Sequence, residues 1–353
     1  MLQHEYSPVS PLSSWSVPTT TAGSPPELRL ASLDGALGVL DDRTYVYRIT
    51  HEGRVQHCLL TLLAVDHLRD GRVLPHEKIL AAKAAAVELA VERDPFSLPP
   101  LYLAYQGAVG LREYLGVLLA GKTPLIDAQT KGTRHQVFRL PSIYGSVIAR
   151  MLASAGQVVI ADGHHRAAAW ASCHRRLGGN YAYLPAVLAP ARDCSVRGFH
   201  RLVSGLNGHT PATLIEALAD DFFISTESGD LEPGSFALFA GNRWWRLRRT
   251  DWDIASPDAV HLQERVLARH LGVGDPRTDA RIEYLPGEIP AHELEARVRS
   301  SPNTVALRLA PPPIGDIFDT VAAGNLLPPH STCFQGKPLE RILTLLKDSS
   351  CVT

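Results

Sequence analysis

Residues 157–179 constrain what this chain can fold into more than any other stretch. The apolar run VVIA (158–161) leads directly into DGHHR (162–166), and a helix-forming run over 167–177 follows and stops at two glycines. A short, mostly β-branched run bounded by a glycine is typical of a strand that ends in a tight turn. The sequence therefore predicts a strand over 157–161, a turn and a helix over 167–177 in direct succession.

This turn has the chemistry of an anion site. The first backbone N–H groups of a helix have no acceptor within the helix, and the helix dipole places partial positive charge beside them. Arg166 adds a planar guanidinium that can donate two hydrogen bonds to phosphate oxygens. Asp162 is the candidate N-cap residue, and Gly163 removes side-chain bulk at the turn. We expect Asp162, Gly163, His164, His165 and Arg166 to bind a phosphate.

Two other interpretations of the same residues stay open. Asp162 can simply cap a core helix, with His164 and His165 on the surface. The paired histidines can also indicate a metal site. Adjacent helix residues point about 100° apart, however, whereas two ligands of one ion usually lie four positions apart, so the metal site is disfavoured.

Composition limits the partners and the location of the protein. The 353 residues carry a formal net charge of −1, so no overall positive field favours DNA, RNA or an anionic membrane. The opening residues lack the features of a signal peptide, and the apolar run 59–65 is too short to span a bilayer. Five scattered cysteines without a CxxC pair fit a reducing compartment. We expect a cytoplasmic protein without nucleic-acid or membrane partners; the oligomeric state is not predicted.

Apolar periodicity and turn residues divide the chain into segments. Residues 1–27 are rich in Ser, Thr and Pro and are expected to form a flexible tail. The length favours two domains, and the cluster of Gly, His, Thr and Pro at 207–211 places their boundary near 208. The expected elements are a hairpin of strands 45–48 and 57–65, helices over 79–93 and 141–156, a hairpin of strands 236–239 and 244–247, and helices near 258–271, 290–300 and 314–323.

The run IADGHHRAAAW (160–170) resembles the signature of a bacterial family known only as a domain of unknown function, number ten-fifteen in its series. That family is similar to the free-serine kinases of the ParB and sulfiredoxin superfamily. The resemblance implies an α/β (α+β) fold, with a ParB/sulfiredoxin-like nucleotide-binding catalytic domain over 28–208 and a second α/β domain over 209–353. It covers residues 28–340 and includes five further segments in order: YVYRITHEGR (45–54), LPHEKIL (74–80), RHQVFRL (134–140), FHRLV (199–203) and LPPHSTCF (327–334).

The resemblance also implies a reaction. A kinase of this kind transfers a phosphoryl group from ATP or ADP, with Mg²⁺, to the hydroxyl of free L-serine or a similar small hydroxy amino acid, giving O-phosphoserine. The segment PHEK (75–78) matches the one that carries the catalytic glutamate of the similar kinases, which makes His76 and Glu77 the catalytic candidates. Because the acceptor hydroxyl must be held in line and lose its proton, Glu77 is assigned as the general base. The alternative is that Glu77 caps the following helix, which favours a carboxylate by about 0.3–1 kcal/mol.

Substrate-binding candidates come from the other matching segments. His200 and Arg201 correspond to a histidine-arginine pair of the family, and the guanidinium can bind the substrate carboxylate or a nucleotide phosphate. An arginine with its stem packed on an apolar surface is the plainer alternative. Arg48 is the third candidate, and Asp162 can hold Mg²⁺ instead of capping the helix. The chain departs from the family pattern where a lysine is replaced by His330 and a tyrosine by Ala167.

The sequence is therefore compatible with three functions. The leading one is a Mg²⁺-dependent free-serine kinase. The alternative is a noncatalytic ParB-like nucleotide-binding regulatory protein, for which the segment WWRLRR (244–249) is the best DNA-binding candidate. A metal-dependent phosphoesterase is suggested only by the Asp and His residues near position 164, and the additional Asp and His motifs that it needs are missing.

Overall fold

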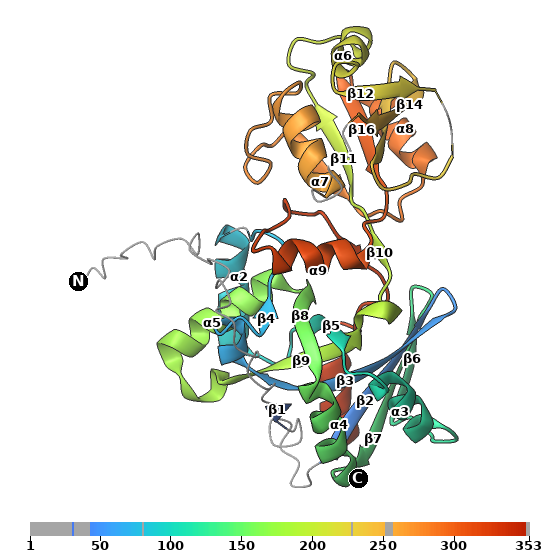
Figure 1. The fold of residues 1–353 in the computed structure, drawn as a ribbon. Helices are drawn as coiled ribbons and strands as arrows, with labels where there is room; N and C mark the ends of the chain where they lie inside the picture. Colours follow the sequence, from blue (N-terminus) through green and yellow to red (C-terminus); the bar gives the residue numbers. More distant parts are fainter. Residues whose placement is uncertain (1–29, 32–42, 80, 227–228, 251–256, 351–353) are drawn as a thin grey trace, which may run out of the picture.

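The computed structural model describes residues 30–31, 43–79, 81–226, 229–250 and 257–350, and the expected tail over 1–27 lies outside them. Figure 1 shows two α/β bodies, one above the other, with helix α9 (Ile314–Ala322) between them. The expected mixed α/β class is confirmed. Within the described ranges, every helix is too short or too polar to cross a membrane.

The larger body is built on one mixed sheet. Its strands follow the order β4-β8-β5-β9-β3-β2-β7-β6, and β1 pairs with β3. The expected hairpin is confirmed, since β2 and β3 pair antiparallel. The strands are β1 (Leu30–Ala31), β2 (Arg43–His51), β3 (Arg54–Ala64), β4 (Val73–Leu74), β5 (Leu101–Gly107), β6 (Ile126–Thr130), β7 (Thr133–Pro141), β8 (Ala155–Asp162) and β9 (Tyr183–Pro190).

Both faces of this sheet are buried. Side chains alternate along β2, so Val46 packs in one core and Tyr45 and Tyr47 pack in the other. The first core includes residues of α3, α4 and α5, and α2 packs beside α5. The helical segments here are η1 (Val65–Leu68), α2 (Ala81–Arg93), α3 (Leu111–Leu119), α4 (Ile143–Ala153), α5 (His164–Leu177), η2 (Gly179–Tyr181) and η3 (Ala191–Asp193). The helices expected over 79–93 and 141–156 correspond to α2 and α4.

The smaller body has a six-stranded sheet in the order β12-β14-β13-β16-β11-β15. The expected hairpin around Gly241-Asn242 is confirmed as β13 and β14, which pair antiparallel. The strands are β11 (His200–Ser204), β12 (Phe222–Ser225), β13 (Ser235–Ala240), β14 (Arg243–Arg249), β15 (Ile282–Leu285) and β16 (Thr304–Leu309). The helices are α6 (Pro211–Leu218), α7 (Asp258–His261), its π-helical continuation η4 (Leu262–Ala268) and α8 (Ala291–Ser300).

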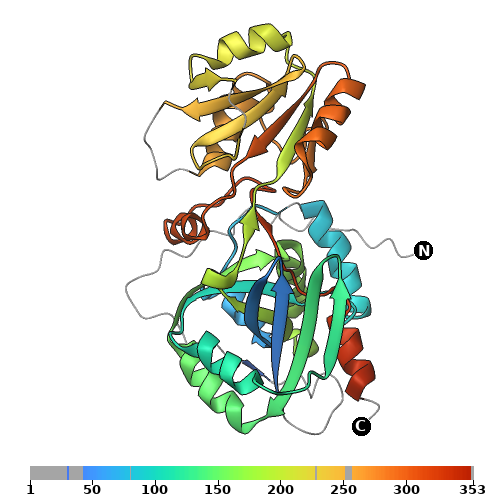
Figure 2. The ribbon, with the colours of Figure 1, turned by 90° about the vertical axis from the view of Figure 1, so that its right-hand side faces the viewer.

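The C-terminal segment returns to the larger body. The short strands β10 (Val196–Arg197) and β17 (Cys333–Phe334) pair with each other. Residues of α9 and of α10 (Ile342–Ser350) pack in the second core, against the face of β2 that carries Tyr45 and Tyr47. Figure 2 shows α10 beside the strands of the larger sheet and α9 seen along its axis.

The division of the chain between the two bodies differs from the predicted domain limits in two respects. The smaller sheet already begins at β11, upstream of the expected boundary near 208. Residues 314–346 complete the larger body's core, although the sequence assigns all of 209–353 to one C-terminal domain. The division into a catalytic and a C-terminal domain stays a prediction. In the structure the chain passes from the larger to the smaller body near residue 198 and returns near residue 310.

Candidate functional site

The turn between β8 and α5 forms the expected strand, turn and helix start. Helix α5 begins at His164, three residues earlier than expected, because Ala167 N–H already donates to Gly163 O at 2.9 Å. Gly163 has φ of 103°, in the left-handed region that favours glycine. A Cβ there would lie 2.6 Å from a terminal nitrogen of Arg166 and 2.9 Å from Cδ1 of Leu101. The guanidinium of Arg166 therefore lies directly over the glycine.

Asp162 is not the N-cap residue that the sequence predicts. Gly163 occupies the N-cap position, and no side chain caps this helix. One carboxylate oxygen of Asp162 accepts a hydrogen bond from Arg166 at 2.9 Å, and the other accepts one from Lys337 Nζ at 2.7 Å. Burial opposes the charge of Asp162, but Lys337 and Arg166 lower the pKa of its carboxyl. Asp162 thus holds two cations at the start of α5.

The surroundings of the turn disfavour the charged form of both of its histidines. Burial lowers the pKa of His164 to about 3, and it also lowers the pKa of His165. His164 Nε2 lies 3.4 Å from the backbone N–H of His76 and accepts its hydrogen bond, and the two rings pack edge to face with centroids 4.6 Å apart. The contact joins the turn to the HE segment, 88 positions away in the sequence.

Glu77 is held by a segment from the other end of the chain. Its Oε1 accepts hydrogen bonds from Ser331 N–H at 3.0 Å, from Thr332 N–H at 2.8 Å and from the Thr332 hydroxyl at 2.8 Å. Its Oε2 accepts one from His330 N–H at 3.2 Å. We call residues 330–332 the clasp. Burial opposes the charge of Glu77, yet His76, His164 and Thr332 hold the pKa of its carboxyl well below the usual value.

His76 connects the clasp to β8. Its ring is fully buried, with Nδ1 2.6 Å from Ile160 O and Nε2 2.6 Å from Thr332 Oγ1. Because a carbonyl oxygen can only accept, Nδ1 carries a proton and donates to Ile160 O. The hydroxyl of Thr332 donates its one proton to Glu77 Oε1 and lies beside Nε2 of His76. The contacts of His76 with Ile160 O and Thr332 Oγ1, together with the bond from Thr332 to Glu77, therefore link β8 to the clasp.

The smaller sheet supports the clasp. The guanidinium of Arg201, on β11, is buried and donates to His330 O at 3.4 Å and to Phe199 O at 2.8 Å. Burial lowers the pKa of Arg201 to about 10. The ring of His330 packs against Tyr284 of β15 at 4.6 Å and against Phe199 at 5.1 Å. Arg201 thus reaches the site through the clasp backbone, and it is buried rather than exposed.

The structure separates two substrate candidates from this cluster. Burial lowers the pKa of His200 to about 4, and its ring interacts with backbone groups of Gly287 and Ile289. Arg48 donates to Gln136 Oε1 at 2.8 Å and stacks on Phe138, 5.0 Å from the ring centroid. Phe138 belongs to the first core of the larger sheet, whereas the clasp side of that sheet carries the second core. Arg48 therefore lies on the other face of the sheet.

Positive groups outnumber carboxylates around the site. His330 interacts electrostatically with Lys83, Arg201, Lys337 and Glu77. Arg166 adds a further cation beside Asp162. Arg166 and Lys337 contact the carboxylate of Asp162, and Lys83 and Arg201 interact electrostatically with His330 beside Glu77. This surplus favours an anionic ligand.

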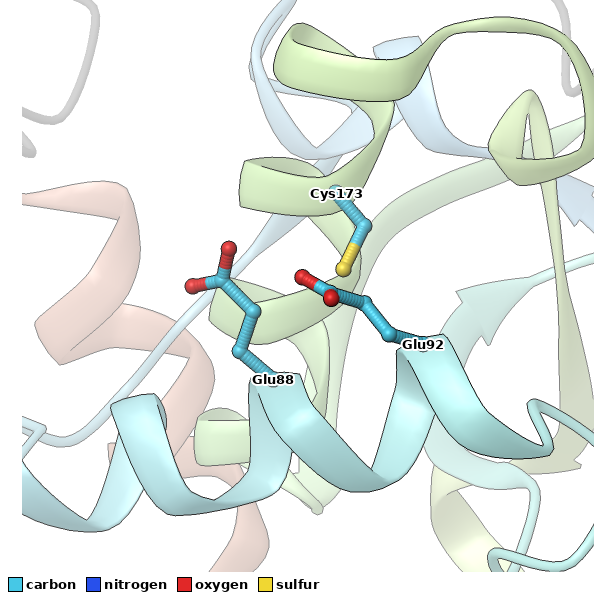
Figure 3. Close-up of side chains that lie close together, drawn as sticks. All are labelled: Glu88, Glu92 and Cys173. Carbon is cyan, nitrogen blue, oxygen red and sulfur yellow. The ribbon is translucent and has the colours of Figure 1, made fainter. Parts of the chain in front are cut away.

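One group of possible metal ligands occurs in the described part of the chain. Figure 3 shows Glu88 and Glu92 on α2 beside Cys173 on α5. The possible ligand atoms of these three residues lie within 4.8 Å of one another. Arg176 donates to both glutamates, and Ser172 donates to Glu88 at 3.0 Å. Burial raises the pKa of Cys173 to about 11, which disfavours the thiolate that a metal needs. The group fits a contact between two helices better than a metal site.

A cavity of about 690 Å³ borders the clasp on another side. Its walls come from β12 and β14, from the start of α7 and from residues 309–317. Leu327 and Ser331 also line it. Ser331 therefore faces this cavity while its N–H donates to Glu77.

Comparison with protein families supports the resemblance that the DGHHR segment suggests. The model of DUF1015, a family described as proteins of unknown function, matches residues 35–273. The chain belongs to the DUF1015 family. The resemblance expected from ADGHHR is thereby confirmed.

A search of curated proteins finds no match for this DUF1015 protein. Among solved structures it is similar to SbnI with C-terminal truncation from Staphylococcus aureus, at 15% identity and a TM-score of 0.45, covering 83% of this chain and 94% of that chain. It is also similar to a conserved hypothetical protein from Pyrococcus furiosus, at 15% identity and a TM-score of 0.40, covering 78% and 90%. A free serine kinase in complex with AMP is similar at 16% identity and a TM-score of 0.41, covering 78% and 86%.

Several residues of the site are missing from the sequence-based assignment. Ser331 and Thr332 lie in the matching segment LPPHSTCF but have no role assigned there. Lys337 lies just beyond that segment, and its partner Asp162 is 175 positions away. The basic residue and the two hydroxyl residues near the end of the chain are a weak signal, since such residues are common on surfaces.

Proposed function

We propose that this protein is a nucleotide-dependent kinase that phosphorylates the hydroxyl of a small free amino acid, with L-serine as the first candidate and O-phosphoserine as the product. One observation carries the proposal. The HE segment and the DGHHR turn, which the family resemblance pairs as base and phosphate site, are in contact through His76 and His164. A carboxylate and an anion-binding helix start thus lie together under a surplus of positive charge.

The DGHHR turn is the proposed phosphate site. The amides of His164, His165 and Arg166 precede the first intrahelical donor and lie at the positive end of the helix dipole. Arg166 and Lys337 now donate to Asp162, and phosphate oxygens would share these donors. ATP or ADP is the proposed donor.

Asp162 does not fit the expected role of a Mg²⁺ ligand. Both of its oxygens already accept hydrogen bonds from cationic side chains, and a metal ion there would meet the positive charges of Arg166 and Lys337. We therefore propose Mg²⁺ as a companion of the nucleotide phosphates, whose charge it would neutralise, and assign it no protein ligand.

Glu77 is the proposed base, and its two oxygens differ. Oε1 accepts three hydrogen bonds from the clasp, whereas Oε2 accepts one longer bond, from His330 N–H. Oε2 is therefore the oxygen with capacity to accept a bond from the substrate hydroxyl. The lowered pKa keeps Glu77 ionised, so it orients that hydroxyl and takes its proton late in transfer, when the new O–P bond has made the proton acidic.

The test is direct. Purified protein is incubated with Mg²⁺, ATP or ADP, and a mixture of free amino acids, and phosphorylated products are identified by mass spectrometry. We expect O-phosphoserine above the level of a heat-inactivated control with at least one nucleotide. Absence of any phosphorylated amino acid with both nucleotides would reject the kinase.

The clasp also supports a second candidate, a noncatalytic nucleotide-binding regulator. Three backbone amides and a hydroxyl on one carboxylate are what a purely structural glutamate would show. The DNA-binding candidate of this hypothesis is less well supported. β14 is an inner strand between β12 and β13, and Arg249 pairs with Asp258. Nucleotide binding without phosphoryl transfer, together with DNA retention that falls as salt increases, would favour the regulator.

A further inference from the structure

Lys337 comes to the DGHHR turn from the far end of the chain, and its backbone is fixed on both sides. Before it, β17 pairs with β10, and Gln335 N–H donates to Ser195 O at 2.8 Å. After it, Leu339 N–H donates to the hydroxyl of Tyr47 at 3.0 Å. The chain then enters the second core at Ile342. The backbone position of Lys337 therefore does not depend on the ion pair that its side chain makes.

Gly336 fixes the backbone immediately before Lys337. It has φ of 61°, and a Cβ there would lie 2.9 Å from Gln56 Nε2 and 3.3 Å from His51 Cβ. Only glycine suits this conformation at so close an approach. The chain turns here and directs the next side chain towards Asp162, where Nζ of Lys337 lies 2.7 Å from the carboxylate.

The ion pair itself does little for the fold. The side chain of Lys337 is 43% exposed and that of Asp162 is 31% exposed, and ion pairs at such exposure contribute little to stability. Arg166 already neutralises Asp162, so Lys337 leaves the turn with a net positive charge. A half-exposed ammonium at the start of a helix, beside a guanidinium, is suited to an anion that approaches from solvent.

We infer that Lys337 is a phosphate-binding residue for the nucleotide, supplied by the C-terminal segment to complete the DGHHR turn. The inference rests on the proposed function only in taking a nucleotide as the ligand. Without ligand, the carboxylate of Asp162 holds Lys337 and Arg166 in position. With ligand, their N–H groups donate to phosphate oxygens while Asp162 keeps the two side chains oriented.

The experiment measures binding by calorimetry in the full-length protein, with ADP, ATP and adenosine as separate probes. We expect Lys337→Ala to weaken ADP and ATP binding by about tenfold to a hundredfold, the cost of losing a charge-assisted hydrogen bond. Adenosine, which has no phosphate, should bind wild type and variant equally. Lys337→Arg should recover most of the affinity, since it retains the charge.

Lys347→Ala is the matched control, because Lys347 is an exposed lysine on α10 in the same C-terminal segment. Its nucleotide affinity should equal that of the wild type. Unchanged ADP and ATP affinity in Lys337→Ala, an equal loss for adenosine, or no binding of either nucleotide by the wild type would overturn the inference. Phosphate-dependent binding that needs Lys337, in a protein that makes no phosphorylated amino acid with either nucleotide, would reject the kinase and support the inference.

Discussion

The carboxylate of Glu77 serves two purposes in the proposed mechanism. Its Oε1 holds the clasp in place through three hydrogen bonds, and its Oε2 accepts the substrate hydroxyl. Under the proposed mechanism, the same residue contributes to the stability of the fold and to the reaction. Replacing it should affect both, and the two effects can be measured separately.

Glu77→Gln should lower the turnover of amino-acid phosphorylation by about 10²- to 10⁴-fold, the usual contribution of a general base. Nucleotide affinity should change little, because Asp162, Arg166 and Lys337 are unaltered. The measurements are product formation at saturating substrates and calorimetry with ADP. Glu216→Gln, an exposed position on α6 of the smaller body, is the control and should retain full turnover. Equal turnover in Glu77→Gln and wild type would remove the base from the mechanism.

The acid stability of the protein should also depend on Glu77. The folded state lowers the pKa of this carboxyl below its unfolded value of about 4.3, so the unfolded state binds the proton more readily. The resulting stability is present above about pH 4.3 and is lost as the pH falls further towards the folded pKa. Urea unfolding at pH 7, 5, 4 and 3 measures this. We expect the stability difference between wild type and Glu77→Gln to shrink below pH 5; parallel curves would contradict the assigned hydrogen bonds.

At the scale of elements, the β8–α5 turn depends on the absence of a side chain at Gly163. Gly163→Ala places a methyl group 2.6 Å from Arg166 and 2.9 Å from Leu101, in a left-handed conformation. We expect a loss of about 1–3 kcal/mol in the free energy of unfolding and at least about a tenfold loss of ADP affinity, because Arg166 must move. Urea unfolding and calorimetry check the two effects.

Gly132→Ala is the control for this turn. Gly132, in the β6–β7 turn, also has positive φ, of 75°, but a Cβ added there would meet no atom within 4 Å. Gly132→Ala therefore has the cost of a left-handed backbone conformation but no steric contact. Its ADP affinity should equal that of the wild type. A smaller loss of stability in Gly163→Ala than in Gly132→Ala would mean that the close contact with Arg166 is absent in solution.

Local elements could be predicted from the sequence because their signals are local. The VVIADGHHR run predicts the strand, the turn and the helix start, and the helices over 79–93 and 314–323 follow from their apolar spacing. The prediction of Asp162 as the N-cap residue is wrong, because Lys337 and Arg166 both bind its carboxylate. The clasp could not be predicted, since Glu77 and its backbone donors are 253 to 255 positions apart.

At the scale of the whole molecule, the chain crosses between the two bodies twice. It enters the smaller body near residue 198 and returns near residue 310, so that α9 and α10 cover one face of the larger sheet. The boundary predicted near 208 marks only the first crossing, whereas the return coincides with Pro311-Pro312-Pro313, a break signal that the prediction did not use. The return also brings the clasp and Lys337 to the site. Segments from residue 76 to residue 337 therefore contribute to it.

The smaller body should control the clasp, because Tyr284 and Arg201 both contact His330. Tyr284 packs against His330 at 4.6 Å and lies under the guanidinium of Arg201 at 5.5 Å. Tyr284→Leu keeps an apolar side chain but removes both ring contacts, each aromatic contact being worth about 0.5–1.5 kcal/mol. We expect the amides of Ser331 and Thr332, which donate to Glu77, to exchange hydrogen about 3- to 10-fold faster in this variant.

Hydrogen exchange followed by mass spectrometry or NMR measures this coupling without depending on activity. Tyr183→Leu, at a more exposed tyrosine of β9, is the control and should leave exchange at residues 331 and 332 unchanged. If Glu77 is the base, Tyr284→Leu should also slow phosphoryl transfer. ADP affinity should stay constant, because the proposed phosphate site belongs to the larger body and the C-terminal segment. Unchanged hydrogen exchange at Ser331 and Thr332 would show that the larger body alone maintains the clasp. The smaller sheet would then not affect the hydrogen bonds of Glu77.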